Sequence, residues 1–400
     1  MTLALHTPPP KLDALMNVAR RPDAVFTHGH GSWLHDSQGR RYLDLVQGWA
    51  VNTLGHAPPQ IAAALAAQSQ RLLQPGPGFF NDRAAELASR LAALSGLDRV
   101  FFTSSGAEAN EGAIKLARKF GQVHRGGAHE IVTFENAFHG RTLATMSASG
   151  KPGFDRLFAP QVPGFPKARL NDLDSVRALI GPQTVAVMLE PIQGEAGVIE
   201  ATPGFMQALR ALCDERGLLL ILDEVQTGVG RTGTLWGFEA AGVKPDVMTL
   251  GKGLGGGVPI GALLAREAVC CFEPGDQGGT YCGNPLMCAV ALAVLDAVTG
   301  AGFLDAVAAR SAQLREGLDA IARRLGSPPV VGRGLLLALE LPGDDAATRL
   351  ASTLIARADE AEPGLLVNAV RPRRLRFMPA LNVEAAELAS ALAMLDAAVS

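Results

Sequence analysis

The chain has 400 residues, of which 48% are hydrophobic and 19% are charged, and its formal net charge is −3. This length predicts two or three domains, and this composition excludes bulk disorder. A nearly neutral chain has no overall attraction for nucleic acid or for an anionic membrane, so we expect neither as a partner. Its apolar runs, such as 218–222, are much shorter than the roughly 20 residues that a membrane-spanning helix needs.

The five cysteines and the N-terminus indicate the compartment. No two cysteines form a C-x-x-C pair, and the first residues lack the charged and apolar regions of a signal peptide. We therefore expect a reduced, cytoplasmic protein.

In chain order, the pattern begins with a hairpin over residues 31–44, followed by two helices at about 59–73 and 82–94. After these helices, short and continuously apolar strands alternate with further helices. The expected strands are 100–103, 130–134, 185–190, 218–222, 246–250 and 259–264, and the helices among them include 107–120 and 203–216. Such an alternation predicts a largely parallel sheet that is covered on both faces.

A change in composition near residue 295 indicates a second, smaller domain. Beyond it lie Ala-rich helices and short strands, at about 288–301, 303–325, 335–341 and 373–378. We therefore expect an α/β protein with a large domain over residues 61–294 and a small α+β domain over residues 295–400. The N-terminal segment, residues 1–60, is expected to pack with the small domain.

Lys252 has the most unusual context of the seven lysines, because it follows a buried strand directly and has a glycine on each side. Burial lowers the pKa of a lysine amine and makes it nucleophilic, which suits Schiff-base chemistry. The alternative is a lysine that extends from a strand end into solvent, with glycines that only form turns. A P-loop is excluded, because the required spacing is absent.

Asp223 also follows a fully apolar strand, 218–222. A carboxylate at a buried strand end needs a partner, and the protonated pyridine nitrogen of pyridoxal phosphate would be one. The alternatives are a helix cap and a metal ligand. Because Asp223 and Glu224 have no His or Cys nearby in the sequence, a metal site is disfavoured and we expect none.

Two more segments follow predicted strands. Residues 103–110 turn from a strand into a helix, whose N-terminus would bind an anion such as phosphate. A simple serine cap of that helix is an alternative that is compatible with phosphate binding. In the segment 133–142, Phe138 could stack on a planar ring and Arg141 could bind a carboxylate. The alternatives are a core phenylalanine and a surface arginine, and His139 is expected to be structural.

Together these features resemble the class III aminotransferases, which depend on pyridoxal 5′-phosphate, and within that family they are most similar to the enzymes that act on acetylornithine. The resemblance spans about residues 33–385 and implies the type I aminotransferase fold, with a mostly parallel sheet in the large domain. It rests on segments that occur in the family's order and spacing, at 43–45, 50–56, 103–110, 138–142, 190–197, 222–233, 250–257 and 279–285.

The resemblance implies a role for each matching residue. Lys252 would hold the cofactor covalently and move the substrate proton, and Asp223 would keep the pyridine nitrogen protonated. The other cofactor contacts would be Gly106 and Ala107 at the phosphate, Phe138 and Val225 on the ring faces, Gln226 at the ring oxygen, and Thr280 from the second subunit of a homodimer. Active sites would thus lie at the dimer interface.

The resemblance also implies the substrates. Arg141 would bind a substrate carboxylate, and Arg376 would bind the α-carboxylate of 2-oxoglutarate. Glu195 would pair with Arg376 when that carboxylate is absent. The implied reaction moves the terminal amino group of N2-acetylornithine to 2-oxoglutarate, which gives the semialdehyde and glutamate.

Two departures from the family pattern leave the amine donor open. Many acetylornithine enzymes have a serine that contacts the substrate where this chain has Gly279, and Cys282 stands where glycine or asparagine is more usual. Succinylornithine, ornithine and 4-aminobutyrate therefore remain alternative donors. An aminomutase or a non-catalytic protein with the same fold are further alternatives. The pairing of Glu195 with Arg376 argues against the aminomutase, and the presence of Lys252 and Asp223 argues against the non-catalytic protein.

Overall fold

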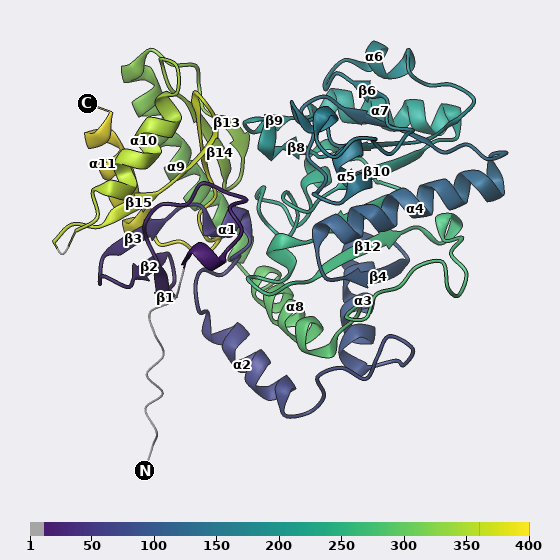
Figure 1. Cartoon of the computed structure of the whole chain (residues 1–400), viewed down its shortest axis with the longest axis horizontal. Helices are drawn as coiled ribbons and strands as arrows, with labels where there is room; N and C mark the ends of the chain where they lie inside the picture. The colour runs from purple at the N-terminus through teal and green to yellow at the C-terminus, as the bar shows by residue number, and fades with distance from the viewer. Residues whose placement is uncertain (1–11, 360, 400) are drawn as a thin grey trace.

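The computed structural model describes residues 12–359 and 361–399, so the expectations for residues 1–11, 360 and 400 lie outside the described part. Figure 1 shows a large, mostly teal body beside a smaller, yellow-green one. The purple N-terminal strands lie against the yellow-green C-terminal elements rather than against the teal sheet.

A seven-stranded sheet forms the centre of the large body. Its spatial order is β4 (Arg99–Thr103), β12 (Gly261–Ala265), β11 (Val247–Leu250), β10 (Leu219–Asp223), β7 (Thr184–Leu189), β5 (Glu130–Phe134) and β6 (Lys167–Ala168). All neighbours are parallel except β12, which runs antiparallel to both β11 and β4. The strands β7, β10, β11 and β12 are buried along their whole lengths, which explains why their sequences are mostly apolar rather than alternating.

Helices cover the two faces of this sheet. Leu219 and Ile221 of β10 belong to one apolar cluster, whereas Leu220 and Leu222 belong to another, as alternation along a strand requires. The first face is covered by α4 (Gly106–His124) and the second by α3 (Asp82–Ser95), α7 (Pro203–Arg216) and α8 (Pro285–Val298). The expected helix at 288–301 lies three residues earlier, because Asn284 accepts hydrogen bonds from the amides of Leu286 and Met287 and Pro285 opens the first turn.

The small body contains two four-stranded sheets. One has the order β13 (Val331–Arg333), β14 (Leu336–Glu340), β17 (Arg374–Phe377) and β16 (Asn368–Arg371). The other has β1 (Phe26–His30), β2 (Trp33–Asp36), β3 (Arg41–Asp44) and, parallel to β3, β15 (Gly364–Leu366). Leu43 and Leu45 share an apolar core with α9 (Phe303–Leu325), α10 (Ala346–Ala356) and α11 (Ala385–Ala398).

The expected boundary after residue 294 falls inside α8. Apolar side chains of this helix as far as Val298 pack in the core of the large body, and the core of the small body begins again with Val307 on α9. The remaining elements are short. The α-helices and strands among them are α1 (Gln47–Ala50), α2 (Pro59–Ser69), α5 (Leu143–Ala148), α6 (Leu173–Arg177), β8 (Ile192–Gln193) and β9 (Ile199–Glu200).

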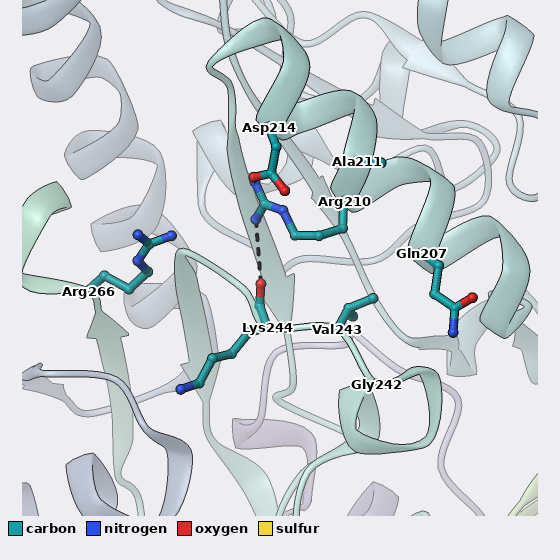
Figure 2. A pocket seen from close by; sticks show the side chains of 8 residues that line it. All are labelled: Gln207, Arg210, Ala211, Asp214, Gly242, Val243, Lys244 and Arg266. Atoms are coloured by element: carbon teal, nitrogen blue, oxygen red, sulfur yellow. Dashed lines mark hydrogen bonds and ion pairs between the residues drawn. The ribbon is translucent and has the colours of Figure 1, made fainter.

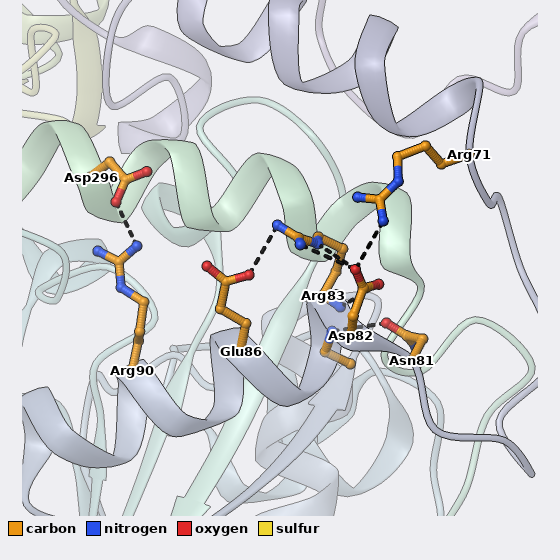
Figure 3. Close-up of polar contacts among 8 residues, drawn as sticks. Arg71, Asn81, Asp82, Arg83, Glu86, Arg90 and Asp296 are labelled. Atoms are coloured by element: carbon orange, nitrogen blue, oxygen red, sulfur yellow. Dashed lines mark hydrogen bonds and ion pairs between the residues drawn. The ribbon is translucent and has the colours of Figure 1, made fainter.

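Polar contacts join α2, α3 and α8 at one side of the large body (Figure 3). Arg90 on α3 pairs with Asp296 on α8 at 2.5 Å, and Arg71 after α2 pairs with Asp82 at 3.3 Å. Asn81 caps α3 by accepting from the amide of Ala84 and also donates to the carbonyl of Gly283 at 2.9 Å. The loop before α3 is therefore fastened to the loop before α8.

No single helix within residues 12–359 and 361–399 is both long enough and apolar enough to cross a membrane. The helices α8 and α9 meet these criteria only when they are taken together, and they meet at a bend of 72°. Eight residues of α8 are buried inside the large body, so its apolar sequence is explained by the core.

Candidate active site

A cavity of about 220 Å³ opens at the carboxyl ends of β10 and β11, where parallel sheets place their ligands. It is lined by Gly106, Ala107, Asn110, Phe138, His139, Gly140, Arg141, Glu190, Asp223, Val225, Gln226 and Lys252. The structure thus brings together in one cavity every cofactor residue expected from the sequence except Thr280, and adds Arg141 at its wall.

Lys252 lies two residues after the end of β11, in the cavity wall. Burial lowers the pKa of its amine, although the carboxylate of Glu195 opposes this shift. Its backbone has a φ of 38°, which is uncommon for a residue with a side chain and is typical of functional sites. At the preceding Gly251, a Cβ atom would lie 3.0 Å from Cα of Gly106, so the glycine lets the start of α4 approach this turn closely.

Asp223 ends β10 and is held by three donors. Its Oδ2 atom lies 2.7 Å from Nδ1 of His139 and accepts from the amide nitrogen of Asn110 at 2.7 Å, and its Oδ1 atom accepts from the backbone of Val225 at 3.0 Å. Asn110 is fixed in turn by the hydroxyl of Thr249, which donates to its Oδ1 atom at 2.6 Å. These contacts fix the orientation of the carboxylate toward the cavity.

Glu190 is a cavity residue to which sequence reasoning assigned no role. It comes directly after the buried strand β7, and Asp223 is the last residue of β10, so both stand at the carboxyl end of a buried strand. This shared position is the signal that could have found Glu190. Burial, together with the charge of Asp223, raises the pKa of Glu190 well above its usual value. Its Oε2 atom accepts from the backbone amide of Phe138 at 3.0 Å, so Glu190 fixes the segment that carries this ring.

The first turn of α4 forms the opposite wall of the cavity. Ser105 caps the helix by accepting from the amide of Glu108, as the sequence predicts, and leaves Gly106 and Ala107 at the cavity. A Cβ atom at position 106 would lie 2.6 Å from a methyl carbon of Val225. The glycine therefore allows the helix N-terminus to lie directly against Val225.

A buried ion pair adjoins the cavity. Arg376 on β17 is 1% exposed and donates to Glu195 at 2.8 Å, to Asn368 at 2.8 Å and to Gln226 at 3.2 Å. Burial raises the pKa of Glu195, but the positive charges of Arg376 and Lys151 outweigh it and lower the pKa to about 2. The pair joins the large and small bodies, because Glu195 belongs to the former and Arg376 to the latter.

The family follows from a comparison with known proteins. The model of the family described as Aminotransferase class-III matches residues 16–399. The chain belongs to the class III aminotransferases. It is therefore a pyridoxal-phosphate-dependent aminotransferase with the type I fold, which excludes the non-catalytic alternative.

Relatives and solved structures cover nearly the whole of this aminotransferase. "Acetylornithine aminotransferase 2" of Bordetella bronchiseptica is 60% identical over 98% of both chains, and "Acetylornithine aminotransferase" of Ralstonia nicotianae is 55% identical over 96% of both. The N-acetylornithine aminotransferase structure from Stenotrophomonas maltophilia has a TM-score of 0.82 at 37% identity, covering 95% of this chain and 96% of that one. An aminotransferase from Vibrio fluvialis in its PMP-bound form has a TM-score of 0.89 at 26% identity and covers 98% of both chains.

The cavity of this aminotransferase fits pyridoxal phosphate. Among the described residues, the buried Nε2 atoms of Gln226 and His139 have no hydrogen-bond partner. An unpaired amide nitrogen in the cavity wall suits the oxygen substituent of a pyridine ring, and the α4 N-terminus suits a phosphate. The carboxylate of Asp223 and the amine of Lys252 complete a donor set for this cofactor.

Arg141 and Phe138 form one aromatic and cationic wall. The guanidinium carbon of Arg141 lies 6.0 Å from the ring centre of Phe138 and 5.4 Å from that of Phe154, and the arginine is exposed. Stacking against these rings orients the guanidinium at the mouth of the cavity while it remains accessible to a carboxylate.

Gly279 and Thr280 lie outside the lysine cavity of their own chain. They line a separate hollow of about 280 Å³ together with Glu108, Glu111 and Cys282. Thr280 is exposed, and its carbonyl accepts from the side chain of Gln74 at 2.5 Å. The contacts with substrate and cofactor that were expected of Gly279 and Thr280 would therefore have to be made in the cavity of a second subunit.

A larger hollow, of about 420 Å³, lies near the amino end of β11 and beside α7 (Figure 2). Asp246, at the start of β11, accepts from Arg210 at 2.8 Å, from Arg266 at 2.6 Å and from the amide of Leu220 at 2.8 Å. Arg210 also pairs with Asp214 at 2.7 Å. These arginines are paired with carboxylates at the amino ends of the strands, far from Lys252, so the hollow is explained as part of the scaffold.

Proposed function

We propose that this enzyme transfers the terminal amino group of N2-acetylornithine to 2-oxoglutarate, which gives the acetylated semialdehyde and glutamate. The observation that carries the proposal is the buried ion pair between Glu195 and Arg376 beside the lysine cavity. The names of the relatives support the donor, because those at 60% and 55% identity are called acetylornithine aminotransferases.

The cavity residues divide the chemistry among them. The cofactor supplies an electron sink for the charge that is left when the substrate carbon loses a proton. In this proposal Lys252 holds the cofactor and moves that proton, and Asp223 pairs with the ring nitrogen. The remaining contacts are Gly106 and Ala107 with the phosphate, Phe138 and Val225 with the ring faces, and Gln226 with the ring oxygen.

Two unlike substrates must use one site. The donor brings an uncharged methylene chain to the place where 2-oxoglutarate brings its α-carboxylate. A free Arg376 would attract the donor's own α-carboxylate and present the wrong amine, so Glu195 neutralises it during the first half of the reaction. Arg141, at the cavity mouth, would then bind the carboxylate at the far end of either substrate.

We propose a homodimer whose active sites include Thr280 of the second subunit. Phe79 and Phe80 are 72% and 105% exposed, which is unusual for aromatic side chains on a single chain. They lie in the loop before α3, which the hydrogen bond from Asn81 to Gly283 joins to the loop before α8. Thr280 belongs to this second loop. A second copy would cover these rings and bring Thr280 to the phosphate of the other site.

We further propose that the enzyme works in the cytoplasm. All five cysteines are free in the structure, and burial raises the pKa of both Cys213 and Cys288 to about 12. Thiols of this kind are inert structural side chains in a reducing compartment.

A donor panel tests the substrate. The holoenzyme is incubated with 2-oxoglutarate and, separately, N2-acetylornithine, succinylornithine, ornithine and 4-aminobutyrate, and glutamate is measured. We expect the highest kcat/KM for N2-acetylornithine. A higher value for another donor would replace the substrate but keep the reaction, whereas no glutamate with any of them would reject the amino transfer to 2-oxoglutarate. A Lys252→Ala preparation is the control for contaminating activity.

A further inference from the structure

The carboxylate of Glu195 lies between two cations. Its Oε1 atom is 2.8 Å from Nη2 of Arg376, and its Oε2 atom is 3.3 Å from Nζ of Lys151. Nothing in the sequence pattern singled out Lys151, which lies in the loop after α5. The two cations reach Glu195 from different bodies, and each uses its own oxygen, so either contact can persist without the other.

Opening the Glu195–Arg376 pair affects its two members unequally. Arg376 keeps Asn368 and Gln226 as hydrogen-bond partners, and it gains the carboxylate of the keto acid. Glu195 gains nothing from that carboxylate, with which it shares a negative charge. If Arg376 were the only cation beside Glu195, opening the pair would leave a largely buried carboxylate without a partner, which is strongly destabilising. A second cation beside Glu195 therefore lowers the cost of the opening.

Lys151 is positioned to be this partner. Its ammonium lies 5.6 Å from the ring centre of Phe138 and 5.8 Å from that of Phe154, and its side chain is 29% exposed. Contacts with two ring faces hold the ammonium near the site. Among the described residues, no carboxylate other than Glu195 forms an ion pair with Lys151.

We propose that Lys151 is a specificity-determining residue that holds Glu195 while Arg376 binds the keto acid. This proposal rests on the proposed function, in which Arg376 binds the α-carboxylate of 2-oxoglutarate. Lys151 lowers the cost of separating the ion pair, and so favours the half-reaction with 2-oxoglutarate over the half-reaction with the amine donor.

The test compares Lys151→Met with the conservative Lys151→Arg. Each half-reaction is followed in single turnovers by the cofactor absorbance, and the affinity for glutarate, a dicarboxylate that cannot react, is measured by calorimetry. In Lys151→Met we expect glutarate binding and the 2-oxoglutarate half-reaction to weaken by about two- to fivefold, as for the loss of one partly exposed ion pair. The donor half-reaction should change less, and Lys151→Arg should restore most of the loss.

The same substitution in a Glu195→Ala background separates the possible roles of Lys151. If Lys151 acts through Glu195, Lys151→Met should have no further effect on glutarate binding in that background. An equal loss in both backgrounds would mean that Lys151 binds the dicarboxylate directly, and this would overturn the proposal. Unchanged glutarate binding in Lys151→Met alone would overturn it as well.

Arg376→Gln distinguishes a failure of this proposal from a failure of the proposed function. If Arg376→Gln weakens glutarate binding but Lys151→Met does not, only the role of Lys151 is wrong. If Arg376→Gln also leaves glutarate binding unchanged, then Arg376 does not bind the keto acid, and both proposals fall.

Discussion

Asp223 illustrates what single residues contribute to this site. Its position after a buried strand indicates from the sequence that it needs a partner. The structure adds two further partners besides the expected cofactor, because His139 and Asn110 both contact its Oδ2 atom. Those two residues come from a loop and from a helix, and their contacts with Asp223 have no periodic signature in the sequence. The strand-end residue could therefore be predicted, and its neighbours could not.

The first prediction concerns the single residue Lys252. Lys252→Ala should abolish steady-state turnover while leaving the fold intact, because proton transfer by a positioned base contributes about 10²–10⁴-fold and the covalent hold on the cofactor is also lost. Turnover is measured with N2-acetylornithine and 2-oxoglutarate, and the far-UV circular dichroism serves as the control for folding. Activity within about tenfold of the wild type would contradict the role of Lys252.

A second prediction concerns the charge of Asp223. Asp223→Asn keeps the shape and can still accept from the amide of Val225, but it cannot pair by charge with a protonated ring nitrogen. We expect loss of most activity and a shift in the visible absorption of the bound cofactor. Thermal stability should also fall, because the new amide NH2 group would face the donors of Asn110 and His139. Normal activity in the Asn variant would reduce Asp223 to a structural partner of His139.

Among secondary-structure elements, the prediction was accurate where local residues mark the ends of an element. The helices 203–216 and 303–325 were predicted at the bounds that the structure shows. Pro203 begins the first helix and Gly217 ends it, and Gly326 ends the second. The strands β1, β13, β15 and β16 and the helices α10 and α11 are among the elements that were missed. These strands have only three to five residues, and their burial comes from pairing with distant segments, such as β15 with β3. Tertiary pairing of this kind leaves little trace in a local pattern.

The loop before α8 gives a prediction about specificity. A Cβ atom at position 279 would lie 2.6 Å from Sγ of Cys282, so the two departures from the family pattern depend on each other sterically. Gly279→Ser alone requires the thiol to move, whereas Gly279→Ser with Cys282→Gly does not. If a serine hydroxyl here bonds N2-acetylornithine, the double variant should lower KM by the equivalent of about 0.5–1.5 kcal/mol, more than the single variant does. Cys282→Gly alone is the control, and an unchanged KM in the double variant would indicate a different donor.

The end of α5 gives a prediction about pH. Lys167 on β6 donates to the hydroxyl of Thr133 and to the carbonyls of Ser147 and Ala148 at 2.6–2.9 Å, and burial lowers the pKa of its amine to about 7 from 10.5. Between these two pKa values the unfolded chain binds more protons than the folded chain. Lys167 therefore makes the free energy of unfolding rise with pH from about 7 to 10, by at most about 1.4 kcal/mol per pH unit.

Urea unfolding at several pH values measures this contribution. In Lys167→Met the free energy of unfolding should rise less steeply between pH 7 and pH 10 than in the wild type. Lys244→Met, which removes a lysine from an exposed position, is the matched control. Equal slopes in all three proteins would mean that Lys167 titrates at the same pH in the folded and unfolded chains.

For the whole molecule, the site depends on contacts between segments that are far apart in the sequence. Arg376 lies on a strand of the small body and meets Glu195 and Gln226 of the large body. From composition and periodicity alone, nothing indicates that these three side chains meet, and only the family resemblance suggested the pair. For Thr280 the expected contact is not even within one chain, because it lies outside the lysine cavity and its expected partner is a second subunit. Contacts between residues that are far apart in the sequence, or on different chains, were predicted from the family resemblance and not from local sequence patterns.

The last prediction tests whether the active site is completed by a second subunit. Lys252→Ala removes the reactive amine, and Thr280→Asp would repel a phosphate at the site that Thr280 reaches. Each homodimer should be inactive. In a mixed dimer that shares sites across the interface, one site carries both defects and the other carries neither.

Unfolding the two variants together and refolding them should therefore restore activity, because half of the dimers formed at random are mixed and each has one intact site. The restored activity should approach about a quarter of that of the same amount of wild type, as a symmetric interface requires. If Thr280 instead serves the site of its own chain, every site in the mixed dimer has one defect, and refolding restores nothing. Phe80→Asp, which places a charge in the exposed aromatic loop, should prevent dimers from forming and abolish the recovery, as sedimentation and activity together would reveal. A stable, active monomer would instead assign both Phe80 and Thr280 to the free surface of the enzyme.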